Sequence, residues 1–188
     1  EGKPMHFYPH CYPCCVNQIE RVLARVGLDD AAQMRVQRAM LMIIAEMDPE
    51  KTISSEVMYY LQRELQRETG LDDPLEKEKL RATREALKLL PELRVIMKKN
   101  RGGLETALRL ALAGNIIDTG LMHGYHLPEV VQQALTAPLA LNSVQKLRDA
   151  LAKTDWVLML ADNAGETVFD RVLIETLGKR VVYAVKEH

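Results

Sequence analysis

The sequence predicts an α/β protein in which a long helical region precedes a strand–helix–strand unit. Six apolar residues, 156–161, run without a polar break and are too few for a helix, so they indicate a fully buried strand of a parallel sheet. Residues 166–177 follow with an apolar face, and Gly178 is suited to end that helix. The apolar run 181–185 then predicts a second strand.

Ahead of this unit, apolar residues recur at helical spacing between Gly, Asp and Pro. The expected helices cover about residues 16–26, 30–47, 54–69, 74–90, 92–99, 104–113, 128–137 and 143–151. Residues 6–15 and 118–127 are expected to be loops, and Pro91 should break or kink its helix. We therefore expect a mainly helical region over residues 1–153 and the first strand–helix–strand unit over residues 154–188, with no flexible linker between them.

Composition excludes several classes of protein. The chain has 188 residues and a formal net charge of −1, so nothing favours binding to nucleic acid or to an anionic membrane. No apolar run approaches the roughly 20 residues of a transmembrane helix, and no signal peptide is evident. The three cysteines lie within residues 11–15, too close for a disulfide framework, which favours a reducing cytoplasm.

Polar residues follow both expected strands. Asp162 and Asn163 come directly after the first strand and offer hard oxygen ligands, suited to Mg²⁺ or Mn²⁺. Alternatively, Asp162 caps the next helix and Asn163 occupies the turn. Glu166 lies close by, and the backbone amides around Gly165 would suit a phosphate. Lys186 follows the second strand, and parallel pairing should bring it beside Asp162.

Two further groups of residues are candidates. Asn115 and Asp118 are three apart, so on a helical turn they would line one pocket; the alternative is an ordinary helix end at Gly114–Asn115. Cys11 and Cys14 form a CxxC motif that could hold a metal together with further ligands or pack as reduced thiols. The residues that could complete such a metal site are Cys15, His6, His10, His123 and His126.

The CxxC motif and one charge-rich stretch each have a further interpretation. A thioredoxin-like redox pair is less favoured for the CxxC motif, because the motif does not follow a strand and open a helix in a βαβ unit. The charge-rich stretch 76–84 is expected to be a solvated helix face.

Taken together, these motifs resemble a known family. The CxxC motif is followed by Asn17–Gln18, and the segments 89–94, 113–118 and 162–170 carry the sequences LLPELR, AGNIID and DNAGETVFD. In this order they are similar to the metal-dependent damage-control phosphatases, described also as acidic-residue-methyltransferase-like, and most of all to the prokaryotic branch with CxxC.

The resemblance implies a helical region on a Rossmann-like α/β/α parallel sheet. It implies a divalent metal (Mn²⁺, Mg²⁺, Co²⁺ or Ni²⁺) held by Asp162 and Asn163, with Glu166 also in the catalytic group. It places Asn115, Asp118 and Lys186 around the substrate, a small phosphorylated metabolite.

The resemblance also implies a further aspartate after the second strand, and the chain stops at residue 188, before that position. We therefore expect a truncated chain that is inactive by itself, with the activity belonging to a longer protein. A carboxyl methyltransferase that uses S-adenosylmethionine and a non-catalytic metal-binding or interaction module are the alternatives. The sequence lacks a Gly-rich turn after an early strand, which disfavours the methyltransferase.

Overall fold

The computed structural model describes residues 6–100, 103–120 and 127–186, and for residues 116–120, 127 and 128 it describes the backbone alone. The chain forms two compact units, which divide between Glu78 and Lys79. The division expected at residues 153 and 154 separates the chain by type of secondary structure. The division at Glu78 instead separates it by packing, and it groups the strand–helix–strand unit with the helices that contact it.

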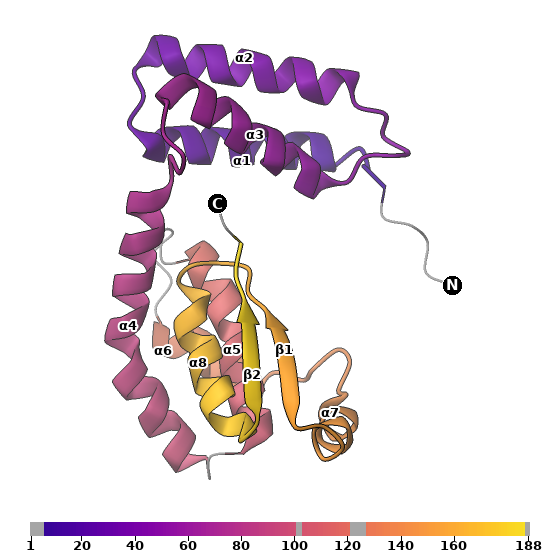
Figure 1. Ribbon diagram of the computed structural model, residues 1–188, viewed down its shortest axis with the longest axis vertical. Coiled ribbons are helices and arrows are strands. Elements are labelled where there is room, and N and C mark those ends of the chain that lie inside the picture. The colour runs from indigo at the N-terminus through magenta and orange to yellow at the C-terminus, as the bar shows by residue number, and fades with distance from the viewer. Residues whose placement is uncertain (1–5, 101–102, 121–126, 187–188) are drawn as a thin grey trace. The chain divides into compact units, whose positions relative to one another are not determined.

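The first unit consists of helices α1 (Cys11–Val26), α2 (Asp30–Glu46) and α3 (Ser54–Thr69) (Figure 1). The three helices follow the expected ranges, which lie between Gly, Asp and Pro residues. Asp29 caps α2 by accepting a hydrogen bond from the Ala32 amide, and Gly27 and Gly70 end α1 and α3 with positive φ angles. Each helix buries one apolar stripe, and together they bury the following residues: Cys15, Ile19, Val22, Leu23, Val36, Met40, Ile44, Val57, Leu61 and Leu65.

The start of α1 corrects one prediction. Residues 6–15 were expected to be a loop, but α1 begins at Cys11, so the CxxC motif opens a helix. Pro13 does not prevent this, because a proline in the first turn lacks only an amide that has no intrahelical partner. The sulfur atoms are therefore held on a helical turn.

The second unit contains most of α4 (Glu76–Lys99), together with α5 (Leu104–Gly120), α6 (Leu127–Thr136), α7 (Val144–Leu151) and α8 (Glu166–Leu177). Pro91 lies inside α4, so the break expected there is wrong, and one helix runs through the proline. Leu90 and Leu93 on either side of it are buried in the core of this unit. Their burial offsets the roughly 3 kcal/mol that an internal proline costs.

The prediction of a helix end at Gly114–Asn115 is also wrong, because α5 continues to Gly120. Of the expected loop over 118–127, residues 118–120 and 127 are therefore helical. Residues 121–126, which include His123 and His126, lie outside the described residues.

Strands β1 (Trp156–Leu160) and β2 (Arg180–Ala184) pair in parallel, in a register that runs from Trp156 with Arg180 to Leu160 with Ala184. Helix α8 connects them, which confirms the predicted strand–helix–strand unit. In Figure 1, α8 lies alongside β2 and α5 lies next to α8. Phe169 and Val172 of α8 join the core that α4 and α5 also line.

The strands differ from the sequence prediction in their burial. Both show alternating exposure, with Met159 packed against the helices while Leu158 is 53% and Leu160 75% exposed. The prediction of a strand buried on both faces is therefore wrong for this chain. Among the described residues, helices cover one face of the sheet and the other face has no cover.

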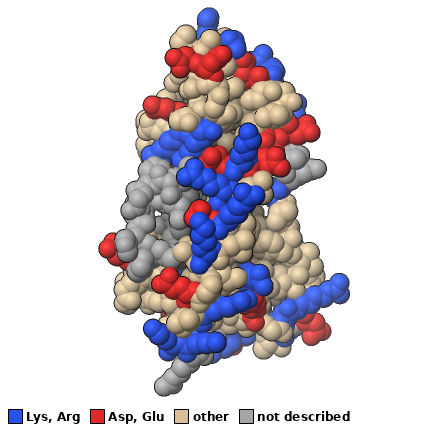
Figure 2. Space-filling model, turned by 90° about the vertical axis from the view of Figure 1, so that its left-hand side faces the viewer, with Lys and Arg blue, Asp and Glu red and all other residues tan. Residues whose placement is uncertain are grey.

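The surface carries both signs of charge. No residue from 76 to 84 is buried, which confirms the solvated helix face. Basic and acidic side chains lie next to one another over much of the face drawn in Figure 2. Within the part of the chain that the structure describes, no helix has the length and apolar character to cross a bilayer.

Candidate active site

The two strands end side by side, and the candidate site lies at this edge of the sheet. Leu160 pairs with Ala184, and Asp162 and Lys186 each follow two residues later. The Lys186 ammonium donates a hydrogen bond to the Asp162 carboxylate, which confirms the predicted placement of these two residues. Both side chains are more than half exposed. An exposed ion pair stabilises a fold by only about 0–1 kcal/mol, so the fold does not depend on this one.

Glu166 is the point where the other site residues meet. The side-chain amide of Asn163 donates to Glu166 Oε2 at 3.1 Å, and that of Asn115 donates to the same oxygen at 3.3 Å. Asn163 also lies 3.4 Å from Asp162 Oδ2. Residues from α5, from the β1–α8 turn and from α8 therefore converge, although 51 positions separate Asn115 from Glu166.

The turn between β1 and α8 decides between two interpretations of Asp162. Gly165 is the N-cap residue of α8. Asp162, three residues earlier, therefore does not occupy the N-cap position. The turn is instead held by the Ala164 carbonyl, which accepts hydrogen bonds from the hydroxyls of Thr167 at 2.7 Å and Thr83 at 3.3 Å.

Gly114 brings α5 close enough for Asn115 to reach Glu166. A Cβ atom at position 114 would lie 2.7 Å from Cβ of Phe169, closer than real Cβ contacts. The glycine thus serves the packing of α5 against α8, rather than ending a helix. The side chain of Asp118, one turn further along α5, lies outside the described residues.

A buried carboxylate and its partly buried partner were missed at the sequence level. Asp170 is 4% exposed and accepts a 2.6 Å hydrogen bond from the Tyr183 hydroxyl. Burial raises the pKa of the Asp170 carboxyl, Tyr183 acts in the opposite direction, and the nearby Glu166 raises it further. The pKa of the Tyr183 hydroxyl is raised as well, mainly by burial and next by its hydrogen bond to Asp170.

The signal for this pair was present in the sequence. Asp170 lies within the apolar stripe of α8 and four residues after Glu166, which puts both carboxylates on one side of the helix. A carboxylate in an apolar stripe needs a partner, and Tyr183 on the neighbouring strand is that partner.

The donor set fits a hard divalent cation in part. Asp162 and Glu166 offer carboxylate oxygens, and Asn163, which donates through its nitrogen, can present its amide oxygen to a cation. Over the described ranges, however, the structure contains no group of three or more His, Cys, Asp or Glu residues that could hold a metal. This holds for the CxxC motif as well, where all three cysteines are free thiols.

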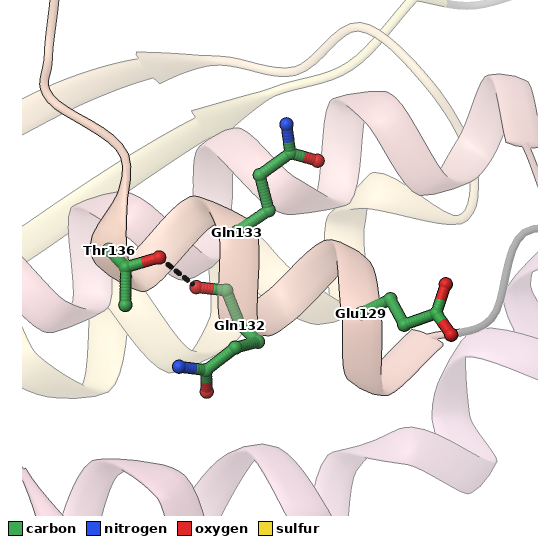
Figure 3. A pocket seen from close by; sticks show the side chains of 4 residues that line it. All are labelled: Glu129, Gln132, Gln133 and Thr136. Atoms are coloured by element: carbon green, nitrogen blue, oxygen red, sulfur yellow. Dashed lines mark hydrogen bonds between the residues drawn. The ribbon is translucent and has the colours of Figure 1, made fainter.

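The hollow drawn in Figure 3 is lined by Glu129, Gln132, Gln133 and Thr136, all from α6. Its one drawn interaction is the bond from the Thr136 hydroxyl to the Gln132 carbonyl at 2.8 Å, which is an ordinary contact within a helix. Among the described residues, none of those that line the hollow belongs to the group around Glu166.

Comparison with known proteins identifies the class. The sequence model of the family described as "Damage-control phosphatase ARMT1-like domain" matches residues 7–188, and the chain belongs to this family. The resemblance stated from the motifs is thereby confirmed at the level of the family.

Individual relatives agree with this assignment. The chain is 27% identical, over 89% of its length, to a damage-control phosphatase of Pyrococcus horikoshii, of which it covers 58%. It is 24% identical, over 94% of its length, to a damage-control phosphatase of Archaeoglobus fulgidus, of which it covers 62%. A crystal structure of a DUF89 family protein from Pyrococcus horikoshii superposes with a TM-score of 0.79 at 26% identity, covering 97% of this chain and 65% of the other. The chain thus spans about three fifths of the length of these relatives.

Proposed function

We propose that this chain forms part of a metal-dependent phosphatase that acts on small phosphorylated metabolites. The observation that carries the proposal is the convergence of Asp162, Asn163, Glu166 and Lys186 at the carboxyl edge of a parallel strand pair. This is the edge at which α/β sheets bind ligands. Membership of a family described by its damage-control phosphatases supports the proposal.

The chemistry of the residues supports a phosphate substrate. We assign the divalent metal to Asp162 and Asn163, and Mn²⁺, Mg²⁺, Co²⁺ and Ni²⁺ are the candidate ions. When bound, such a metal supplies Lewis-acid polarisation of the phosphoryl oxygens. The ligand set needs at least one more carboxylate than the described residues provide.

Lys186 has the role of a cation for the substrate. Its ammonium pairs with Asp162 in this structure. A metal on Asp162 would take over the neutralisation of that carboxylate, and the ammonium could then donate to a phosphate oxygen instead. The exposure of Lys186 fits this change of partner.

Glu166 and Asn115 have positioning and contact roles. Two amides hold Glu166 through Oε2, so its other oxygen is oriented to accept a hydrogen bond from water or a substrate hydroxyl. We place Asn115 and Asp118 on the substrate side, as successive positions on one face of α5.

The test uses the whole protein, because this chain covers 58–62% of its damage-control phosphatase relatives. Phosphate release from a panel of sugar phosphates is measured with Mn²⁺ and with chelator, for the natural protein and for Asp162→Ala. We expect the substitution to lower metal-dependent turnover by at least ~100-fold. Removal of a residue that only supports a metal ligand costs about 10–100-fold, and removal of the ligand itself should cost more. Asp155→Ala, which removes an exposed carboxylate at the opposite end of β1, is the matched control and should retain activity.

Two results would contradict the proposal. One is full metal-dependent activity in Asp162→Ala, which would move the site elsewhere. The other is methyl transfer from S-adenosylmethionine to carboxylates without any phosphate release, which would favour the methyltransferase. Folding of the variant is checked by circular dichroism, so that a loss of activity is not confused with unfolding.

A further inference from the structure

The start of α1 brings together three sulfur atoms that the proposed phosphatase site does not use. Cys11 is the first residue of the helix and is partly buried, Cys14 is exposed, and Cys15 is buried. All three are free thiols. Their different exposures within one helical turn suggest different chemical roles.

Cys11 and Cys14 are neighbours on the helix surface. Residues three apart on a helix have Cβ atoms about 5–6 Å apart, whereas a disulfide needs about 3.5–4.5 Å. A bond between the two sulfurs therefore requires the first turn to tighten by roughly 1–2 Å. Adjacent cysteines such as Cys14 and Cys15 do not offer this geometry, because successive side chains of a helix point in different directions.

The first turn of α1 can make this adjustment. The amide of Cys14 donates to the His10 carbonyl at 3.4 Å, well beyond the usual length of about 2.9–3.0 Å. His10, at the N-cap position, makes no side-chain cap hydrogen bond, and the turn contains no acidic residue. Pro13 fixes one backbone angle between the two sulfurs. The turn is thus weakly held by hydrogen bonds yet limited in the conformations it can take.

Cys15 has a structural role. It is 4% exposed and packs into the apolar core of the three-helix unit. Burial first, and then the neighbouring Cys14 and Cys11, raise the pKa of its thiol, which keeps it protonated and unreactive.

We propose that Cys11 and Cys14 form a reversible intramolecular disulfide by exchange with low-molecular-weight disulfides, and that Cys15 takes no part. The thiolate of the exposed Cys14 attacks one sulfur of the small disulfide, whose S–S bond breaks and releases one thiolate. The Cys11 thiolate then attacks the Cys14 sulfur and displaces the second thiolate. Two protein thiols are oxidised, one small disulfide is reduced to two thiols, and the two protons lost by the cysteines end on the released thiolates.

The experiment equilibrates the whole protein with reduced and oxidised glutathione at a series of ratios. Free thiols are then trapped with N-ethylmaleimide in denaturant, so that the buried Cys15 also reacts, and fragmentation spectra identify the products. At oxidising ratios we expect that, of the three cysteines at the start of α1, only Cys15 is trapped, and that Cys11 and Cys14 are linked with the loss of two hydrogen atoms. Cys15→Ala is the matched control and should form the same link.

The single-cysteine variants separate the two steps. Cys11→Ser should stop at a mixed disulfide between glutathione and Cys14. Cys14→Ser should react with glutathione at least about tenfold more slowly, because the remaining sulfurs are less accessible. Circular dichroism at helical wavelengths checks that each variant is folded. If a variant does not fold, the natural protein by itself still tests whether Cys11 and Cys14 become linked.

Several outcomes would overturn the proposal. They are trapping of Cys11, Cys14 and Cys15 at every ratio, a mixed disulfide on Cys14 as the end product of the natural protein, and a link that includes Cys15. A disulfide between chains as the main product would also overturn it, as would a zinc ion that co-purifies with the protein and protects both thiols until chelator is added.

Discussion

Replacing Tyr183 with phenylalanine should destabilise the unit that carries the candidate site. The substitution removes the hydroxyl that donates to Asp170 at 2.6 Å and leaves the ring in place. Asp170 is 4% exposed, so water does not readily replace the lost donor. Hydrogen bonds to charged groups contribute about 1.5–3 kcal/mol, and we expect a loss of this size wherever Asp170 is ionised.

The loss should depend on pH in a defined direction. The pKa of Asp170 in the folded protein is raised above its ordinary value of 3.8. Between these two pKa values the folded state binds more protons than the unfolded state, so the free energy of unfolding falls as pH rises. Tyr183 opposes this rise, so the pKa of Asp170 should be higher still in the phenylalanine variant. The pH range over which the free energy of unfolding falls should therefore extend to higher pH in the variant. The deficit of the variant should be largest near neutral pH and should shrink towards acid pH.

The assay is urea unfolding at pH about 5 and about 8, followed by the fluorescence of Trp156, the single tryptophan of the sequence. Trp156 begins β1 and so reports on the same unit. Tyr59→Phe, which alters an exposed tyrosine of the first unit, is the control and should change little. A double-mutant cycle with Asp170→Asn isolates the coupling between the two residues.

Equal stability of Tyr183→Phe and the natural protein at both pH values would refute the reasoning. So would a deficit that grows as the pH is lowered, because it would show that the hydroxyl supports a protonated Asp170.

Two further predictions concern the site itself. Gly114→Ala should lower the free energy of unfolding by about 1–3 kcal/mol despite the better helix propensity of alanine, because the new Cβ would meet Phe169. Gly103→Ala, where a Cβ has nothing within 4 Å, is the control. Equal stability of the two variants in urea would contradict the packing argument. Lys186→Ala in the whole protein should lower phosphate-ester turnover by ~100-fold while changing metal affinity less, measured by steady-state kinetics and metal titration. Lys153→Ala, at an exposed lysine ahead of β1, is its control, and a selective loss of metal affinity in Lys186→Ala would contradict the assigned role.

The sequence by itself determined the features that depend on short-range patterns. Two apolar runs and the amphipathic helix between them predicted the parallel strand pair, and the pair in turn placed Lys186 beside Asp162. The helix ends at Gly27 and Gly70 were equally local. These predictions succeeded because the residues that decide each feature are neighbours in sequence, or are brought together by the fixed geometry of a strand–helix–strand crossover.

The tertiary structure decided the features in which a local signal competes with packing. Pro91 does not end α4, because the leucines around it are buried in the core. Gly114 does not end α5, because the glycine is needed for the approach of Phe169. A proline or glycine ends a helix only when its cost inside the helix exceeds the stabilisation that burial of the flanking residues provides. The extent of that burial cannot be predicted from the neighbouring residues in the sequence.

The contacts of Glu166 and Asp170 also required the fold. Asn115 reaches Glu166 from 51 positions away, and Tyr183 reaches Asp170 from the neighbouring strand. The sequence shows that both carboxylates need partners, because one follows a strand end and the other interrupts an apolar stripe. Which partners they find depends on how closely α5 and β2 approach α8, and side-chain packing across the whole unit sets those distances.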